Sequence, residues 1–227
     1  MSKRDRKNAL VVGSTGGIGA ALVDALAPDF EVTTLNRVNT EFTDSGLIEA
    51  ERALPDHIFF SRIVCATGIL HGNVLSPEKS LGQINSESLE TYFLVNTIIP
   101  AILLRTFSPR LCRRDSSVFA CLSAMVGSIG ENRLGGWYGY RSSKAALNMM
   151  VKTASIEIAR HNRNAAIVCI HPGTTRTSLS DPYTKNNGKM PLYDPEVSAS
   201  RIIRVMDSLG PENTGEFRNW NGEIIPW

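Results

Sequence analysis

The sequence predicts a single α/β domain over residues 1–227, with a mostly parallel doubly wound sheet and helices on both faces. Three observations predict this class. Short apolar runs alternate with segments of helical spacing from one end of the chain to the other. Several apolar runs end in turns of small residues, as parallel strands do beside a ligand. A 227-residue chain with 42% hydrophobic residues can also bury a sizeable core.

Residues 8–27 are predicted to form a strand, a glycine turn and a helix. Residues 8–12 are apolar, a turn holds Gly13, Gly17 and Gly19, and residues 20–27 have helical spacing before a proline. Such a turn lets the backbone approach a pyrophosphate, and the helix start adds amide donors. Glycine turns are also common for structural reasons, but this position favours a Rossmann-type NAD(P)-binding domain.

The second predicted strand, residues 30–35, ends at Asn36 and Arg37. An acidic residue that would hold the adenosine ribose is expected about 20 residues after the glycine turn. None stands there, and Arg37 would pair with a 2′-phosphate. The sequence therefore favours NADP(H) over NAD(H); the alternative is a surface arginine at a strand end.

Two further elements carry polar residues of interest. A helix is expected over residues 44–54, and a strand over 58–65 runs into Ala66, Thr67 and Gly68. In the following loop, His71 is assigned no role. A long helix is predicted over residues 88–111, and the polar Asn96 within its apolar run needs a partner or a task.

Tyr140 and Lys144 stand four positions apart in a helix predicted over residues 140–160, after a strand at 117–122. Residues at this spacing share one helix face. An ammonium near a phenol lowers the pKa of the phenol, which makes a tyrosine usable as an acid or base. Taken alone, the pair favours an exposed helical pair with no chemical role.

The remaining elements complete the alternation. A strand at 165–170 ends in residues 171–177, whose threonine hydroxyls and backbone could meet the cofactor. Residues 178–195 are expected to be a mobile loop that acts as a lid. A helix is predicted over 197–209 and a short last strand over 222–227.

Composition excludes several classes of function. The net charge is +2, and the basic cluster at residues 2–7 reads as a solvated leader, so no nucleic-acid partner is expected. The sequence shows no apolar signal segment and no membrane-spanning run, which predicts a soluble, cytoplasmic protein without a membrane partner. The four cysteines, Cys65, Cys112, Cys121 and Cys169, form neither a metal motif nor a disulfide framework. Three of them, Cys65, Cys121 and Cys169, stand in apolar runs and are predicted to be small core residues.

Four motifs in this order resemble the short-chain dehydrogenase/reductase family across essentially the whole chain. They are Gly13-x-x-x-Gly17-x-Gly19, Asn96, Tyr140-x-x-x-Lys144 and Pro172-Gly173. The segments at 127–132 and 135–148 and the Ile224-Ile225-Pro226-Trp227 ending further resemble the C-factor-like branch.

The resemblance implies a role for each matching residue. Tyr140 would be the general acid/base, Lys144 would lower its pKa and bind the nicotinamide ribose, and Asn96 would hold a water that links Lys144 to solvent. The turn from Gly13 to Gly19 would hold the pyrophosphate and adenosine. The cofactor-binding set is Gly13, Ser14, Thr15, Gly17, Ile18, Gly19, Asn36, Arg37, Ala66, Thr67, Gly68, Asn96, Tyr140, Lys144, Pro172, Gly173, Thr175 and Thr177.

Three positions depart from the family pattern. The usual catalytic serine falls on Ala124, and Ser123 or Ser128 is a candidate to replace it. Residues 65–68 lack the two asparagines common in the family, and Val12 stands where a threonine is usual.

These observations predict an NADP(H)-dependent oxidoreductase that interconverts a carbonyl and an alcohol on a small substrate, without a metal. One alternative is a dinucleotide-binding signalling or regulatory protein with little turnover, which the missing serine favours. Another is a pteridine or quinonoid reductase. The resemblance also implies a homodimer or homotetramer formed through the helices at 88–111 and 140–160.

Overall fold

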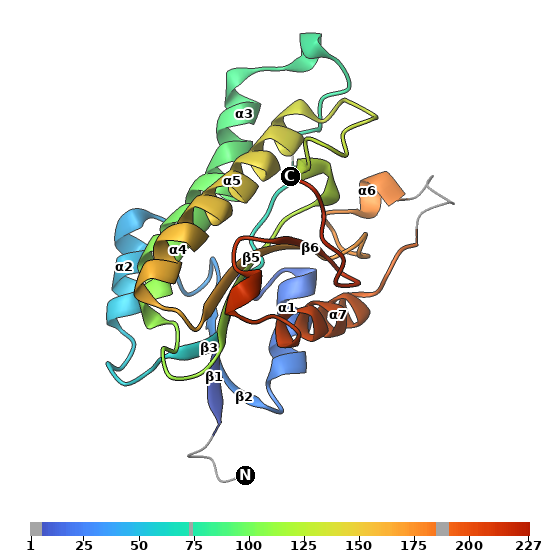
Figure 1. Ribbon diagram of the computed structural model, residues 1–227. Helices are drawn as coiled ribbons and strands as arrows, with labels where there is room; N and C mark the ends of the chain where they lie inside the picture. The colour runs from blue at the N-terminus through green and yellow to red at the C-terminus, as the bar shows by residue number, and fades with distance from the viewer. Residues whose placement is uncertain (1–5, 73–74, 185–190) are drawn as a thin grey trace.

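The structure is a computed structural model that describes residues 6–72, 75–184 and 191–227. Its six strands form one sheet in the order β2-β1-β3-β4-β5-β6, and every neighbouring pair is parallel (Figure 1). The predicted α/β fold class is confirmed. The strands are β1 (Lys7–Val12), β2 (Phe30–Leu35), β3 (Phe60–Cys65), β4 (Ser117–Leu122), β5 (Ala165–His171) and β6 (Phe217–Asn219).

Helices cover both faces of the sheet. On one face α1 packs against α7, and on the other α5 packs against α3 and α4, and α4 against α2 (Figure 1). The α-helices are α1 (Gly17–Leu26), α2 (Asp44–Arg52), α3 (Ser86–Phe93), α4 (Ile99–Phe107), α5 (Tyr138–His161), α6 (Asp181–Thr184) and α7 (Pro195–Asp207). Shorter helical turns are η1 (Leu81–Gln83), the π-helical η2 (Leu94–Ile98), η3 (Ser108–Arg110), η4 (Met125–Gly127) and η5 (Pro211–Asn213).

The central strand β4 explains why the sequence shows an apolar run in place of an alternating pattern. All six of its residues are buried. Phe119 and Cys121 pack under α4 and α5, whereas Val118 and Ala120 pack under α1 and α7. A strand covered by helices on both faces buries both of its side-chain rows.

The predicted last strand is wrong in position. The sequence indicated residues 222–227, but the strand that joins the sheet is β6. Gly222 has a φ of 90°, and this turn reverses the chain so that Ile224 forms an isolated antiparallel bridge with Arg218. The reversed segment then lies against the loop after β4, where Gly130 N donates to the carbonyl oxygen of Trp227 at 3.0 Å.

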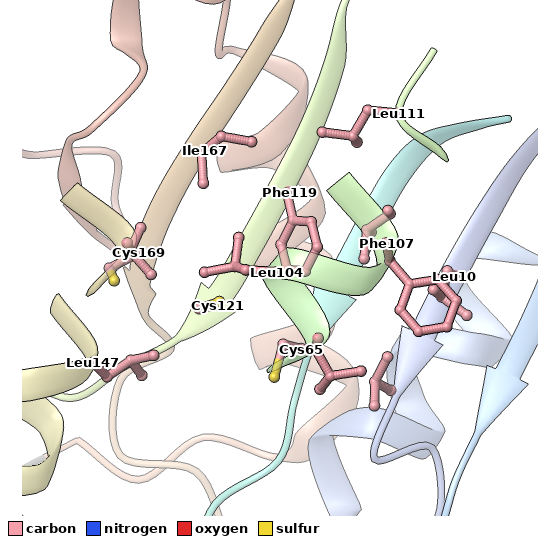
Figure 2. Close-up of a cluster of buried hydrophobic side chains, with 14 of the residues drawn as sticks. Leu10, Cys65, Leu104, Phe107, Leu111, Phe119, Cys121, Leu147, Ile167 and Cys169 are labelled. Carbon is pink, nitrogen blue, oxygen red and sulfur yellow. The ribbon is translucent and has the colours of Figure 1, made fainter. Parts of the chain in front are cut away.

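The helical stretch Ser86–Arg110 is long and apolar enough to span a membrane by length and composition alone, and 44% of its 18-residue apolar window is buried within the protein. Its α4 part contributes Leu103, Leu104 and Phe107 to the core beneath it. The apolar character of the α4 part of this stretch is thus accounted for by its contact with the sheet (Figure 2). Of the predicted basic leader at residues 2–7, only residues 6 and 7 are among the described residues. The middle of the predicted lid, residues 185–190, lies outside them.

Candidate active site

Helix α5 begins at an unusual junction that fixes the position of Tyr140. Trp137, the residue before the helix, has a left-handed φ of 53°, and its N–H donates to the carbonyl oxygen of Glu78. The buried carboxylate of Glu78 accepts a hydrogen bond from Gly139 N at 3.1 Å. A Cβ at Gly139 would meet the ring of Tyr92. The helix start is therefore held by contacts with distant segments.

Tyr140 lies in a closed, mainly apolar cluster with Leu70, Leu75 and Tyr92. Its ring meets the ring of Tyr92 edge-on, with the centroids 6.2 Å apart. Burial raises the pKa of the Tyr140 hydroxyl well above its usual value. The predicted lowering by Lys144 is wrong for this structure, because desolvation outweighs any influence of the ammonium.

Lys144 is buried one turn further along α5, with 3% of the residue exposed. Its Nζ donates to the carbonyl oxygen of Leu122, at the end of β4, over 2.9 Å. Burial lowers the pKa of Lys144, and three nearby cysteines oppose this shift. Gly127 leaves room for the lysine stem, since a Cβ there would come within 2.8 Å of the Lys144 Cβ.

Asn96 lies in the π-helical turn η2 and is fully buried. Its Oδ1 accepts from Ile69 N at 2.9 Å, and its Nδ2 donates to the Ile69 carbonyl oxygen at 3.0 Å and to Ser143 Oγ at 3.1 Å. A Cβ at Gly68 would lie 3.6 Å from both Asn96 Oδ1 and Lys144 Nζ. Asn96 and Lys144 thus meet at the end of β3. The side-chain amide holds this strand end to α5.

The hydroxyl predicted beside Tyr140 is not available from Ser123. Ser123 is buried, and its Oγ donates to Asn148 Oδ1 on α5 at 2.7 Å. Ala124, the next residue, packs in the Tyr140 cluster. Side chains alternate in direction along an extended segment, so Ser123 faces away where Ala124 faces the site. This corrects the prediction that Ser123 replaces the usual serine.

Ser128 is not available either. It is buried, and its Oγ donates to the carbonyl oxygen of Pro226 and accepts from Glu131 N. This serine fastens the reversed C-terminal segment to the loop after β4.

A cleft of about 800 Å³ lies at the carboxyl ends of β1 and β3, where the sheet order changes direction. A pocket of this size suits a small-molecule cofactor. Its lining comprises Gly13, Thr15, Gly16, Arg37, Thr40, Glu41, Phe42, Thr43, Ala66, Thr67, Gly68, Ile69, Leu70, His71, Gly72, Ile99, Ser178 and Leu179.

The glycine turn fits a pyrophosphate. Gly13 has a φ of 84°, and a Cβ at Gly19 would overlap the Gly13 carbonyl oxygen. Helix α1 starts at Gly17 without a side-chain cap and without an acid in its first turn. Its first amide groups therefore remain as donors for an anion.

The other predicted cofactor residues divide between the cleft and the protein interior. Arg37 is exposed on the cleft, and no described residue forms an ion pair with it. Asn36 holds the turn by donating to Ser14 Oγ at 3.0 Å. Ile18 is partly buried against the core under α1.

At the end of β5, Gly173 has a φ of 80°, and a Cβ there would lie 3.0 Å from Trp220 Cδ1. Thr177 packs on Gly17, where a Cβ would lie 2.6 Å from its Cγ2. Thr175 is buried, and its hydroxyl pairs with Ser198 Oγ on α7 at 2.7 Å. Of these two threonines, Thr177 is therefore the one beside the glycine turn.

Residues outside the predicted site cover the Tyr140 cluster. Tyr183 on α6 contacts Trp137, with ring centroids 5.3 Å apart, and Leu179 packs in the same cluster. His71 Nε2 is 2.8 Å from the carbonyl oxygen of Ser178. These residues lie far apart in the sequence and carry no motif, so only the structure reveals them.

Residues 62–188, more than half of the chain, match the model of the short chain dehydrogenase family. The chain belongs to this family. C-signal of Myxococcus xanthus is 30% identical over 148 residues, which make up 65% of this short-chain dehydrogenase and 84% of C-signal. This agrees with the predicted C-factor-like branch.

Two further relatives extend the comparison. An uncharacterized oxidoreductase of Schizosaccharomyces pombe is 30% identical over 151 residues, 62% of this chain, and the match spans 59% of the yeast protein's length. The structure of an NADPH-bound carbonyl reductase from chicken fatty liver has a TM-score of 0.78 at 20% identity, covering 98% of this chain and 99% of the other. At that identity the likeness shows the fold.

Proposed function

We propose that this short-chain dehydrogenase is an NADP(H)-dependent oxidoreductase that interconverts a carbonyl and an alcohol on a small organic substrate. One observation carries the proposal: Tyr140 and Lys144, both buried, lie one helical turn apart. Each lies next to a residue that lines the glycine-turn cleft, since Tyr140 packs with Leu70 and Lys144 Nζ lies near Gly68. Cofactor binding alone does not require a tyrosine there. The NADPH-bound carbonyl reductase with the same fold supports this function.

NADPH, when bound, supplies a hydride to the carbonyl carbon of the substrate. Tyr140 donates its phenolic proton to the carbonyl oxygen. Its raised pKa keeps the hydroxyl protonated in the free protein, which suits the reducing direction. Lys144 would bind the nicotinamide ribose, and its charge would favour loss of the proton from Tyr140 as the reaction proceeds. Asn96 positions the end of β3 and, by family resemblance, would hold a water next to Lys144.

The preference for NADP(H) rests on Arg37. It is exposed on the cleft after β2 and carries no ion pair with the described residues, so its guanidinium is available to a 2′-phosphate. Ser14, Thr15, Ala66, Thr67 and Gly68 would line the adenosine side of the same cleft.

A regulatory protein with little turnover is the second candidate, and Ala124 is the observation that favours it. With no hydroxyl at this position, the substrate carbonyl loses a hydrogen bond that family members commonly provide. The presence of Tyr140, Lys144 and Asn96 together favours the oxidoreductase over the regulatory protein.

We also infer a homo-oligomer in a reducing, cytoplasmic setting. Exposed apolar side chains of η2 and α5, Leu94, Ile98, Met149 and Met150, offer a contact face for a second copy. A groove of about 410 Å³ lies between α4 and α5 on the same side. The four cysteines are all free.

The test is NADPH consumption by the purified protein with a panel of aldehydes, ketones, diketones and quinones. We expect turnover with at least one carbonyl class and a lower KM for NADPH than for NADH. Tight NADPH binding without turnover of any compound would favour the regulatory candidate.

A further inference from the structure

Helix α5 begins without a cap of its own. Trp137, at the cap position, makes no side-chain hydrogen bond to the helix, and the first turn contains no acidic residue. The first amide groups of a helix need acceptors from elsewhere, and a negative charge near them is favourable. Glu78 supplies both from 61 residues away, because its carboxylate accepts from Gly139 N at 3.1 Å. This carboxylate thus takes the place of the missing cap.

The carboxylate of Glu78 lies in the protein interior. Only 2% of the residue is exposed, and no ion pair joins it to any cation in the described part of the chain. Its second oxygen, Oε1, is buried and has no hydrogen-bond partner among the described residues. A Cβ at Gly139 would lie 2.8 Å from this oxygen, so the absence of a side chain there lets the carboxylate reach the helix. Burying such a group is costly unless it is compensated, and the start of α5 is what compensates it.

The backbone of Glu78 holds the residue before the helix. Its carbonyl oxygen accepts from Trp137 N, and Trp137 is the one non-glycine residue with a positive φ in the described ranges. A bulky side chain in the left-handed region is an outlier that its surroundings must enforce. Gly135 and Gly136 also have positive φ, so the chain enters α5 through three such residues. Only Trp137 among them carries a side chain.

The two residues that Glu78 holds determine the surroundings of Tyr140. The Trp137 ring meets the Tyr140 ring edge-on, with the centroids 6.1 Å apart, and the Tyr92 ring does the same at 6.2 Å. Tyr92 in turn lies against Gly139, where a Cβ would come within 2.4 Å of its ring. Tyr140 therefore has an aromatic contact on either side, and both contacts depend on the start of α5.

We propose that Glu78 is a positioning residue for Tyr140: its buried carboxylate caps α5 at Gly139 and its backbone holds Trp137, which together fix the Tyr140 ring between Trp137 and Tyr92. This rests on the proposed function only for its consequence in catalysis. The contacts of Glu78 exist in the free protein and need neither cofactor nor substrate.

Two substitutions separate the hydrogen bond of Glu78 from its charge and its volume. Glu78→Gln keeps an oxygen that can accept from Gly139 N but removes the charge. Glu78→Leu keeps a similar volume and removes the acceptor. Neither substitution alters the backbone carbonyl that holds Trp137. Glu90→Leu, at an exposed position of α3, is the matched control.

The first test is amide hydrogen exchange of the free protein, followed residue by residue by NMR. In Glu78→Leu we expect protection of Gly139 to fall at least about tenfold, because its amide loses a charged acceptor, while Leu147 and Val151 in the middle of α5 stay within about threefold. Glu78→Gln should lose only about threefold at Gly139, since a neutral acceptor forms a weaker hydrogen bond. Unchanged protection at Gly139, or an equal loss along all of α5, would overturn the proposal. If Glu78→Leu does not fold, Glu78→Gln decides by the same criteria.

The second test is kinetic and uses a carbonyl that the wild-type protein reduces. Glu78→Leu should lower kcat per folded protein by about 10- to 100-fold, because a small displacement of a catalytic group is costly. The dissociation constant of NADPH should stay within about twofold, and Glu78→Gln should recover most of kcat. A parallel loss of kcat and NADPH affinity, or an unchanged kcat although Gly139 has lost protection, would also overturn the proposal. If no carbonyl is turned over, the proposed function fails, while the exchange experiment still decides whether Glu78 holds the start of α5.

Discussion

The two ends of the cleft are built in different ways. The proposed adenosine end consists mainly of backbone: the positive φ of Gly13, the close packing at Gly19 and the uncapped start of α1. The proposed substrate end consists of side chains: the buried Tyr140 and Lys144 from α5 and Asn96 from η2, and the half-buried Ala124 after β4. A site built from backbone groups depends on residues, such as glycine, that can adopt the required backbone conformation. Side-chain sites depend on the direction in which each side chain points.

The substitution with the largest expected effect, Tyr140→Phe, should impair the substrate end of the cleft and leave the adenosine end intact. Tyr140→Phe removes the proton donor and should lower kcat by about 10²- to 10⁴-fold. It should leave the dissociation constant of NADPH nearly unchanged, because the glycine turn is untouched. Tyr138→Phe, the same substitution two residues earlier, is the matched control. Steady-state kinetics and cofactor fluorescence measure the two quantities, and a parallel loss of affinity would contradict the separation.

Gly13→Ala tests the other end. A side chain at a left-handed φ costs roughly 1–2 kcal/mol, and the new Cβ would press on the backbone of Ala66 and Thr67. We expect NADPH affinity to fall about tenfold. Cofactor titration by calorimetry measures this, with Gly82→Ala as control, since a Cβ there meets no atom within 4 Å. Unchanged affinity would show that the turn does not hold the cofactor.

Arg37→Ala sharpens the account of the adenosine end. Loss of a charged hydrogen bond to a 2′-phosphate should cost about 2 kcal/mol, which weakens NADPH binding by more than about tenfold. NADH binding should stay the same. Equal effects on the two cofactors, or none on either, would refute the assignment of Arg37 to the phosphate.

Substitution of Ser123 should have the smallest effect on activity. Ser123→Ala should leave kcat/KM within about twofold but lower the free energy of unfolding by about 1–3 kcal/mol, because buried Asn148 loses its partner. Thermal and denaturant unfolding measure this. A severe loss of activity without loss of stability would restore Ser123 to the catalytic site.

Ala124→Ser is the complementary change. It adds a hydroxyl on the side that faces Tyr140 and should raise kcat/KM by no more than about tenfold, the value of one ordinary hydrogen bond. A lower activity would indicate that the site is shaped around the smaller alanine.

Much of the fold could be predicted from the sequence because β1, β3, β4 and β5 each contain an apolar run and are 6 or 7 residues long. The prediction of the last strand is wrong because the turn at Gly222 folds the apolar C-terminal segment back on β6, where it forms only an isolated antiparallel bridge. The glycines and the Tyr140–Lys144 spacing could be recognised because local geometry requires those residue types at those positions.

The rest of the site depends on contacts between distant segments. Glu78 meets the start of α5 through a hydrogen bond that spans 61 residues, and Tyr183 covers Trp137 from α6. The direction of Ser123 depends on the pleat at the end of β4. The sequence correctly predicts Cys65, Cys121 and Cys169 as small core residues. Their alignment across the sheet depends on the register of three strands, which residue spacing in the sequence does not predict.

The most direct test of the central claim follows deuterium from C4-labelled NADPH into the product of a carbonyl that the wild-type protein consumes. We expect the label on the former carbonyl carbon, with transfer reduced at least a hundredfold in Tyr140→Phe and intact in Tyr138→Phe. Label transfer that survives in Tyr140→Phe, or NADPH binding with no transfer to any carbonyl, would contradict the account.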